Sequence, residues 1–167
     1  MNTPTAGERD ALFTSLEAMP DFLADRFGEL APEIARRVGP GGALSPVEQC
    51  WHLADLEAEG FGVRIRRLLT EEKPLLPDFD GARIARERQY RSRSLFEGLR
   101  AFREARDANV ASLRTVRDGD WSRRGVQEGV GELTLVDVPR MMRDHDASHR
   151  AEILAWFQDC CDDLTPG

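Results

Sequence analysis

Two of the three histidines in the chain, His145 and His149, lie four residues apart near its C-terminal end. Residues at this spacing share one face of a helix, one turn apart. Apolar residues continue the same face on both sides, namely Val138, Met142, Ile153, Trp156 and Cys160. The two imidazoles are therefore expected to point into the core, where an unsatisfied polar ring is costly. Two adjacent rings that repel each other when protonated favour a shared cation.

The third histidine, His52, lies in another strongly apolar segment. Three neutral imidazoles suit Zn²⁺, Ni²⁺, Fe²⁺ or Mn²⁺ and leave coordination positions open for a water or a thiol. The pattern predicts a three-histidine metal site inside a helical bundle. Core or surface histidines that bind no metal would show the same spacing, and the residues alone leave that alternative open.

Acidic residues near the histidines are candidates for proton transfer. Glu152 follows His149 by three residues and faces nearly the same way, so it could act as a base or accept a ring N–H. Asp55 stands in the same relation to His52. Both are therefore predicted as catalytic residues.

The elements that must position these residues are helical. Ser45-Pro46-Val47-Glu48 is typical of a helix start, with a serine cap, a proline at the first position and a glutamate that completes a capping box. Apolar periodicity predicts four helices, over residues 8–30 with Pro20 inside, 45–70, 82–116, and from near Pro139 to about 161. Four amphipathic helices predict an all-α protein, a four-helix bundle.

The connections are set by turn-forming residues. Pro74, Pro77 and Gly81 mark a linker, and 117–133 is expected to be irregular with a short extended piece at 126–130. We expect a single domain over residues 8–161, with tails at 1–7 and 162–167.

Composition limits the classes of function. The chain has 167 residues, 41% of them hydrophobic and 32% charged, as in ordinary globular domains. Its net charge of −7 argues against nucleic acid as a partner, and no apolar run is long enough to span a membrane. The N-terminal residues lack a signal-peptide pattern and the three cysteines are an odd number, so a cytoplasmic protein with reduced thiols is expected.

Three stretches in the same order resemble the DinB/YfiT-like superfamily of bacterial metal-binding four-helix bundle proteins. They are 45–57 around His52, Gly131-Glu132-Leu133-Thr134-Leu135 at the entry to the last helix, and 145–153, which is similar to an H-x-x-x-H-x-x-Q-I pattern. The resemblance implies that His52, His145 and His149 are the metal ligands. Glu152 departs from the pattern, because the family usually has glutamine there.

Members of the family include transferases and isomerases that use low-molecular-weight thiols, proteins described as metal-dependent hydrolases, and many without known activity. The resemblance therefore favours a metal-dependent, thiol-using transferase. A hydrolase that uses a metal-activated water is the first alternative, and a non-catalytic metal-binding or interaction module is the second. It also implies a small-molecule substrate and allows a homodimer, which the sequence itself does not show.

Overall fold

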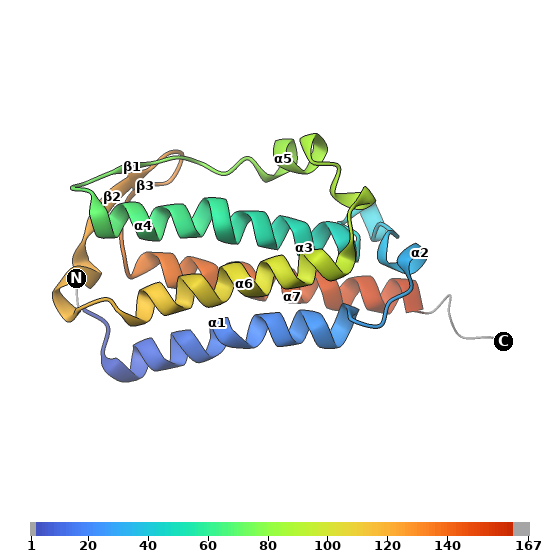
Figure 1. The fold of residues 1–167 in the computed structure, drawn as a ribbon, viewed down its shortest axis with the longest axis horizontal. Coiled ribbons are helices and arrows are strands. Elements are labelled where there is room, and N and C mark those ends of the chain that lie inside the picture. Colours follow the sequence, from blue (N-terminus) through green and yellow to red (C-terminus); the bar gives the residue numbers. More distant parts are fainter. Residues whose placement is uncertain (1–2, 162–167) are drawn as a thin grey trace.

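The computed structural model describes residues 3–161, and the ends at 1–2 and 162–167 lie outside the described residues. Its long helices run side by side, with a small sheet at one end and a short helix at the other (Figure 1). The helices are α1 Ala6–Phe27, α2 Pro32–Ala35, α3 Pro46–Asp55, α4 Gly62–Thr70, α5 Gly81–Glu87, α6 Leu95–Arg114 and α7 Asp137–Cys161. Short 3₁₀ turns are η1 Pro40–Gly42, η3 Tyr90–Ser92 and η4 Asp118–Ser122, and η2 Leu56–Phe61 is a π-helix. The strands are β1 Leu75–Leu76, β2 Arg124–Gln127 and β3 Gly131–Thr134.

The first helix begins earlier than predicted. Thr5 caps α1 through a capping box with Glu8, so the helix starts at Ala6, inside the stretch predicted as a tail. It continues through Pro20 and ends at Phe27 rather than at residue 30. The predicted cap of the second helix is confirmed, because Ser45 accepts from the backbone N–H of Glu48 while the Glu48 side chain accepts from Ser45.

The second rod of the bundle, predicted as one helix over 45–70, contains a π-helical segment. α3, η2 and α4 follow one another without a break, and the π segment η2 holds six residues. Asn109 on α6 donates to the carbonyl oxygen of Glu57 in this segment, at 2.8 Å. Such π-bulges are frequent at functional sites, and this one changes which side chains the rod presents to its neighbours.

The prediction of one long helix over 82–116 is wrong. The chain breaks into α5, the turn η3 and α6, which begins only at Leu95. Gln89 has a φ of 49°, a left-handed conformation that no α-helix can contain, and Ser94 caps the new helix by accepting from the Glu97 N–H. The break lets α5 lie across α3 instead of extending α6.

The connection before α7 forms more strand than predicted. β2 and β3 pair as an antiparallel hairpin, and β1, from the predicted linker, pairs parallel to β2. The expected extended piece at 126–130 falls across the end of β2 and the hairpin turn. Asp137 at the start of α7 accepts from the backbone N–H and the hydroxyl of Thr134, each at 2.7 Å, which ties this helix to the sheet.

A polar layer divides the core of the bundle. One apolar cluster lies toward the sheet end, with Leu16, Phe61 and Met142, and a second lies toward the other end, with Leu23, Trp51 and Ile153. Along the second rod, α6 and α7, polar interior residues lie near the boundary between the two clusters. They include His52, Glu57, Arg106, His145, Asp146 and His149.

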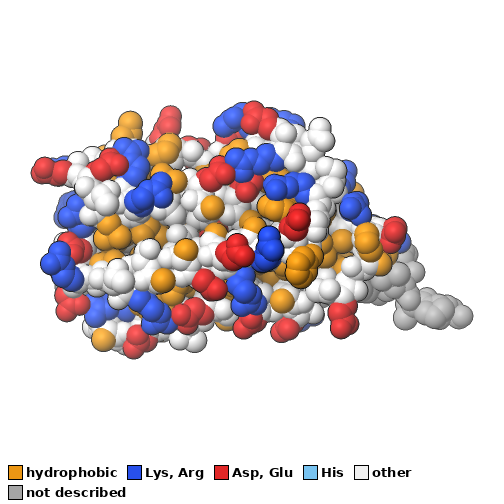
Figure 2. Space-filling model, in the orientation of Figure 1, with side chains coloured by type: hydrophobic (Ala, Val, Ile, Leu, Met, Phe, Trp, Pro, Cys, Tyr) orange, Lys and Arg blue, Asp and Glu red, His pale blue; other side chains and the backbone are white. Residues whose placement is uncertain are grey.

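The outer surface carries charges of both signs. Figure 2 shows acidic and basic side chains interspersed over the face in view, with apolar side chains between them. Within residues 3–161, no helix is long and apolar enough to cross a membrane.

Candidate metal centre

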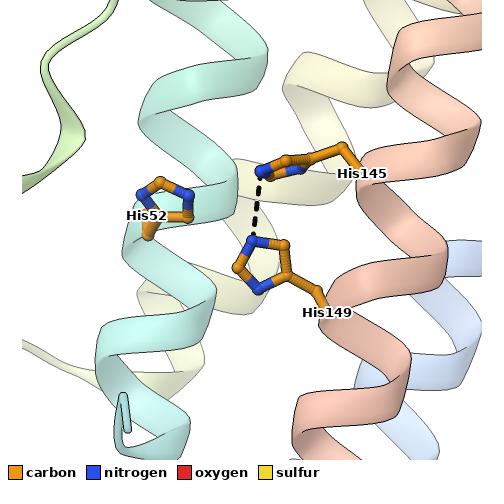
Figure 3. Close-up of side chains that lie close together, drawn as sticks. All are labelled: His52, His145 and His149. Carbon is orange, nitrogen blue, oxygen red and sulfur yellow. Dashed lines mark hydrogen bonds between the residues drawn. The ribbon is translucent and has the colours of Figure 1, made fainter.

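The three histidines meet in the interior between two rods of the bundle. His52 projects from α3 toward His145 and His149 on α7 (Figure 3). One potential ligand atom from each ring lies within 4.8 Å of the other two. The ring centroids of His145 and His149 are 4.3 Å apart, and His52 lies 5.6 Å and 5.1 Å from them. The folding of the chain therefore brings together residues that are about a hundred positions apart in the sequence.

Burial keeps these imidazoles neutral. It lowers the pKa of His149 to about 3 and that of His145 to about 4, and the neighbouring rings add to both shifts by mutual repulsion. Burial also lowers the pKa of His52, against the attraction of Glu152 and Asp55. A neutral imidazole has a free lone pair, which is the form that binds a metal ion.

Gln49 orients the ring of His149. The amide oxygen of Gln49 accepts from His149 Nδ1–H at 2.5 Å, and the amide nitrogen donates to Glu152 Oε2 at 3.0 Å. These two bonds place the proton of His149 on Nδ1 and leave its Nε2 with a lone pair. That Nε2 faces His145 Nε2 at 3.1 Å. Gln49 thus directs the free lone pair of His149 into the cluster.

Glu152 lies on the Nδ1 side of His149, away from the Nε2 that faces His145. Its carboxylate is 3.6 Å from His149 Nδ1, the nitrogen that does not face His145, and it accepts from Gln49. The structure therefore places it as an outer partner of the ring through Gln49. Its predicted part in catalysis stays a prediction.

Asp55 is bound elsewhere. Tyr90 donates its hydroxyl to Asp55 Oδ2 at 2.5 Å, and Arg88 pairs with the same oxygen at 2.7 Å. These contacts attach the segment around η3 to α3. The carboxylate of Asp55 thus binds an arginine and a tyrosine rather than a histidine. Its predicted catalytic role also stays a prediction.

Aromatic and glycine residues shape the space around the rings. Phe79 lies edge-on to His52 at 6.3 Å, and Phe61 lies edge-on to His145 at 6.0 Å. A Cβ atom at Gly81 would sit 2.9 Å from His52 Cε1, so a larger residue at this position would push on the ring. Aromatic groups thus form part of the surroundings of His52 and His145.

A buried ion network holds the two rods in place beside the histidines. Arg106 makes five hydrogen bonds: two to Glu57, two to Asp146 and one to the carbonyl oxygen of Leu16, at 2.7 to 3.0 Å. Glu57 belongs to η2, and Asp146 follows His145 directly on α7. This single guanidinium therefore links α1, the second rod and α7 at the level of the site.

His145 and His149 have the spacing of two ligands of one divalent transition-metal ion, and a ligand atom of His52 lies within 4.8 Å of theirs. Two nitrogens that share one ion at about 2.1 Å, with angles of roughly 90–109°, lie about 3.0–3.4 Å apart. The two Nε2 atoms of His145 and His149 are 3.1 Å apart, within this range. Within the described residues the group has three members, so an ion held there would keep positions open for other ligands.

Sequence reasoning found the three histidines and missed what supports them. Gln49 precedes His52 by one helical turn, and this spacing was a usable signal. Arg106 and Phe61 carried no signal of their own, because each joins the site only through packing between helices that are distant in sequence.

Comparisons with known proteins identify the family and the fold. Residues 15–153 match the family profile described as the DinB superfamily. The solved structure of YfiT from Bacillus subtilis is described as that of a probable metal-dependent hydrolase with an unusual four-helix bundle topology. It is similar to this chain with a TM-score of 0.87 and 19% sequence identity, over 96% of this chain and 91% of YfiT. At this identity the likeness establishes the fold. No curated protein matches the chain.

Proposed function

Since the chain belongs to the DinB superfamily, we propose that it is a metal-dependent hydrolase whose divalent ion is held by His52, His145 and His149. The observation that carries the proposal is the convergence of three neutral imidazoles, one buried and two half-buried, with ligand atoms within 4.8 Å of one another and three protein ligands in the group. An ion with open positions supplies Lewis-acid activation of a water or of a substrate carbonyl or phosphoryl oxygen. YfiT, which shares the fold, is described as a probable metal-dependent hydrolase.

Other residues would orient the ligands and shape the surroundings of the ion. Gln49 holds the His149 ring in the tautomer that binds a metal, and Glu152 fixes the amide of Gln49. Phe61 and Phe79 exclude water from the sides of the site, which strengthens electrostatic interactions with a bound substrate.

Two other functions compete with this one. The thiol-using transferase, which the sequence favours, rests on family resemblance alone, and no contact at the site distinguishes a thiol from a water. A non-catalytic metal module would be expected to close its coordination sphere with a fourth protein ligand, whereas the group described here has three.

The first test is elemental analysis of protein purified without a His-tag. Wild type is expected to hold close to one divalent ion per chain, and His52→Ala and His149→Ala should each lose it. Asp144→Ala is the matched control, because Asp144 lies on the same helix with an exposed carboxylate that pairs with Arg143. Metal absent from wild type, even after reconstitution with Zn²⁺, Ni²⁺, Fe²⁺ or Mn²⁺, would refute the proposal.

The second test separates the reaction classes. Metal-loaded wild type is screened for hydrolysis of ester, amide and phosphoester substrates, with His149→Ala as the blank. In parallel, calorimetry measures binding of bacillithiol, mycothiol and glutathione. Hydrolysis lost in the variant supports the proposal. Tight binding of one thiol without any hydrolysis would favour the transferase instead.

A further inference from the structure

Arg64 on α4 is a buried cation whose hydrogen-bonding capacity is not met. Only 4% of its surface is exposed, and its Nε–H is buried without a hydrogen-bond partner. Within residues 3–161 it forms no ion pair, and Asp78 attracts it only from a distance. Burial of an unpaired charge is costly, so such a group in a folded protein calls for an explanation.

Arg106, which is also buried, differs from Arg64 in its hydrogen bonding. Arg106 uses all of its N–H donors on two carboxylates and a carbonyl. Arg64 has the face of Phe61 beneath it, with the guanidinium carbon 5.3 Å from the ring centroid. An aromatic face attracts a cation but takes no conventional hydrogen bond from it, so this contact leaves the N–H groups of Arg64 available to an anion.

The π segment turns Arg64 toward the histidines. In a regular α-helix, a residue twelve positions after His52 would face about 120° away from it. The wider π turn of η2 lies between the two residues and removes roughly 90° of this rotation. Arg64 therefore faces nearly the same side of the rod as His52. Side chains of helices also lean toward the N-terminal end, which directs the guanidinium back over Phe61 and toward the site.

Two contacts place Arg64 beside the metal centre. Phe61, which carries the guanidinium on its face, lies against His145 at 6.0 Å. The positive charge of Arg64 also helps to lower the pKa of His145, so the two groups are within electrostatic range. Among the residues that the structure describes, Arg64 is thus a cation near the three-histidine site that has no ion-pair partner.

We propose that Arg64 binds the anionic group of the substrate, so that the site acts on small molecules that carry a carboxylate or a phosphate group. This inference rests on the proposed function and names the substrate class of the same site. A guanidinium suits either oxyanion, because its N–H groups match the two oxygens of a carboxylate or of a phosphate. The anion would replace the missing partner of Arg64, and its binding would position the rest of the substrate near the metal ligands.

The test follows the Arg64 side chain directly. The Nε–H resonance of Arg64 is assigned by its loss in Arg64→Lys and is recorded while sodium acetate or sodium phosphate is added at constant ionic strength. Both the metal-free and the Zn²⁺-loaded protein are titrated. A saturable shift with one or both anions, and none with neutral acetamide or with sodium chloride, is expected. The anion that binds more tightly distinguishes a carboxylate from a phosphate substrate.

Variants separate this role from general charge effects. Arg64→Met is expected to weaken binding of the preferred anion by at least about tenfold, as loss of a charged hydrogen bond predicts. Arg66→Met removes the same charge from an exposed position two residues away and should leave the affinity within twofold. Equal affinity in wild type and Arg64→Met, or no shift of the Arg64 resonance with either anion, would overturn the inference.

Metal content, measured in the same samples, keeps the two proposals apart. Arg64→Met should hold as much metal as wild type, because Arg64 is not among the histidine ligands. If wild type holds no metal, the proposed hydrolase fails, and the metal-free titration still decides whether Arg64 binds an anion.

Discussion

At the scale of single residues, the orientation of a ligand matters as much as its identity. His149 is held by Gln49, which is in turn held by Glu152 on the helix of His149 itself. These two hydrogen bonds connect the first turn of α3 to the middle of α7 through the amide of Gln49. Glutamate at position 152 fits this arrangement, because a carboxylate can only accept, and this forces the amide nitrogen of Gln49 toward it and the oxygen toward His149.

Replacement of Gln49 should weaken metal binding without unfolding the protein. In Gln49→Ala the Nδ1–H of His149 loses its acceptor, so the ring can take the other tautomer or turn away. We expect the affinity for Zn²⁺ to fall about 10- to 100-fold, as for other partners of metal ligands. Competition with a chelating dye measures it. Gln158→Ala, at an exposed position of the same α7 that carries His149, is the control. Unchanged affinity in Gln49→Ala would contradict the role given to this amide.

At the scale of elements, Arg106 and the π segment set how the second rod faces α7. Arg106 reaches Glu57 in η2 and Asp146 on α7, and all three side chains are almost fully buried. Asn109 adds a bond to the Glu57 carbonyl oxygen. Such a network stabilises one relative placement of the rods, because any shift would leave buried charges without partners.

Removal of Arg106 should therefore cost far more than removal of a surface arginine. Arg106→Met leaves Glu57 and Asp146 buried next to each other, and we expect a loss of roughly 3–5 kcal/mol in the free energy of unfolding. Arg103→Met, on the same helix, breaks an exposed pair with Asp21 and should cost less than about 1 kcal/mol. Urea denaturation followed by circular dichroism compares the two. Similar losses in both variants would show that the network does not hold the rods together.

At the scale of the whole molecule, the folded bundle favours the neutral form of its three histidines, whereas acid favours the protonated form. The folded state keeps His145 and His149 neutral down to pH values of about 4 and 3, whereas in the unfolded chain they take up protons near pH 6.5. Below about pH 6.5 the unfolded state thus binds more protons than the folded one, so the metal-free protein loses stability as the pH falls.

The pH dependence can be assigned to the histidines by a variant. Each neutral histidine contributes a slope of roughly 1.4 kcal/mol per pH unit in this range. Glu57 and Asp146, whose pKa values burial raises, act in the opposite direction, but both are present in wild type and variant, so the comparison isolates His145. Urea titrations of metal-free wild type should show a steeper loss than those of His145→Gln. Parallel curves would indicate that His145 is already protonated in the folded protein.

Much of the architecture follows from the sequence alone. Apolar periodicity and the capping box at Ser45 predict the helices of an all-α bundle, because both are local properties that neighbouring residues determine. The spacing of His145 and His149 likewise places them on one face of a helix, whatever the rest of the chain does. The small sheet was not predicted, because the strands of its hairpin are only four residues long and the two residues of β1 pair with a segment far along the chain.

Only the tertiary structure decides which of these residues meet. The break before α6 lies at Gln89, which has a left-handed backbone, and the π turn of η2 accompanies a hydrogen bond from Asn109 on α6. Neither feature shows in local periodicity. The surroundings of the two acidic candidates also do not show in the sequence. Asp55 pairs with Arg88 and accepts from Tyr90, and Glu152 accepts from Gln49. The sequence by itself determined that His145 and His149 share one helix face, because this spacing is a local property, and it predicted that all three histidines lie on apolar helix faces. Packing between helices decided that the three converge, that Gln49 orients one of them, and that the Nε–H of Arg64 finds no hydrogen-bond partner among the described residues.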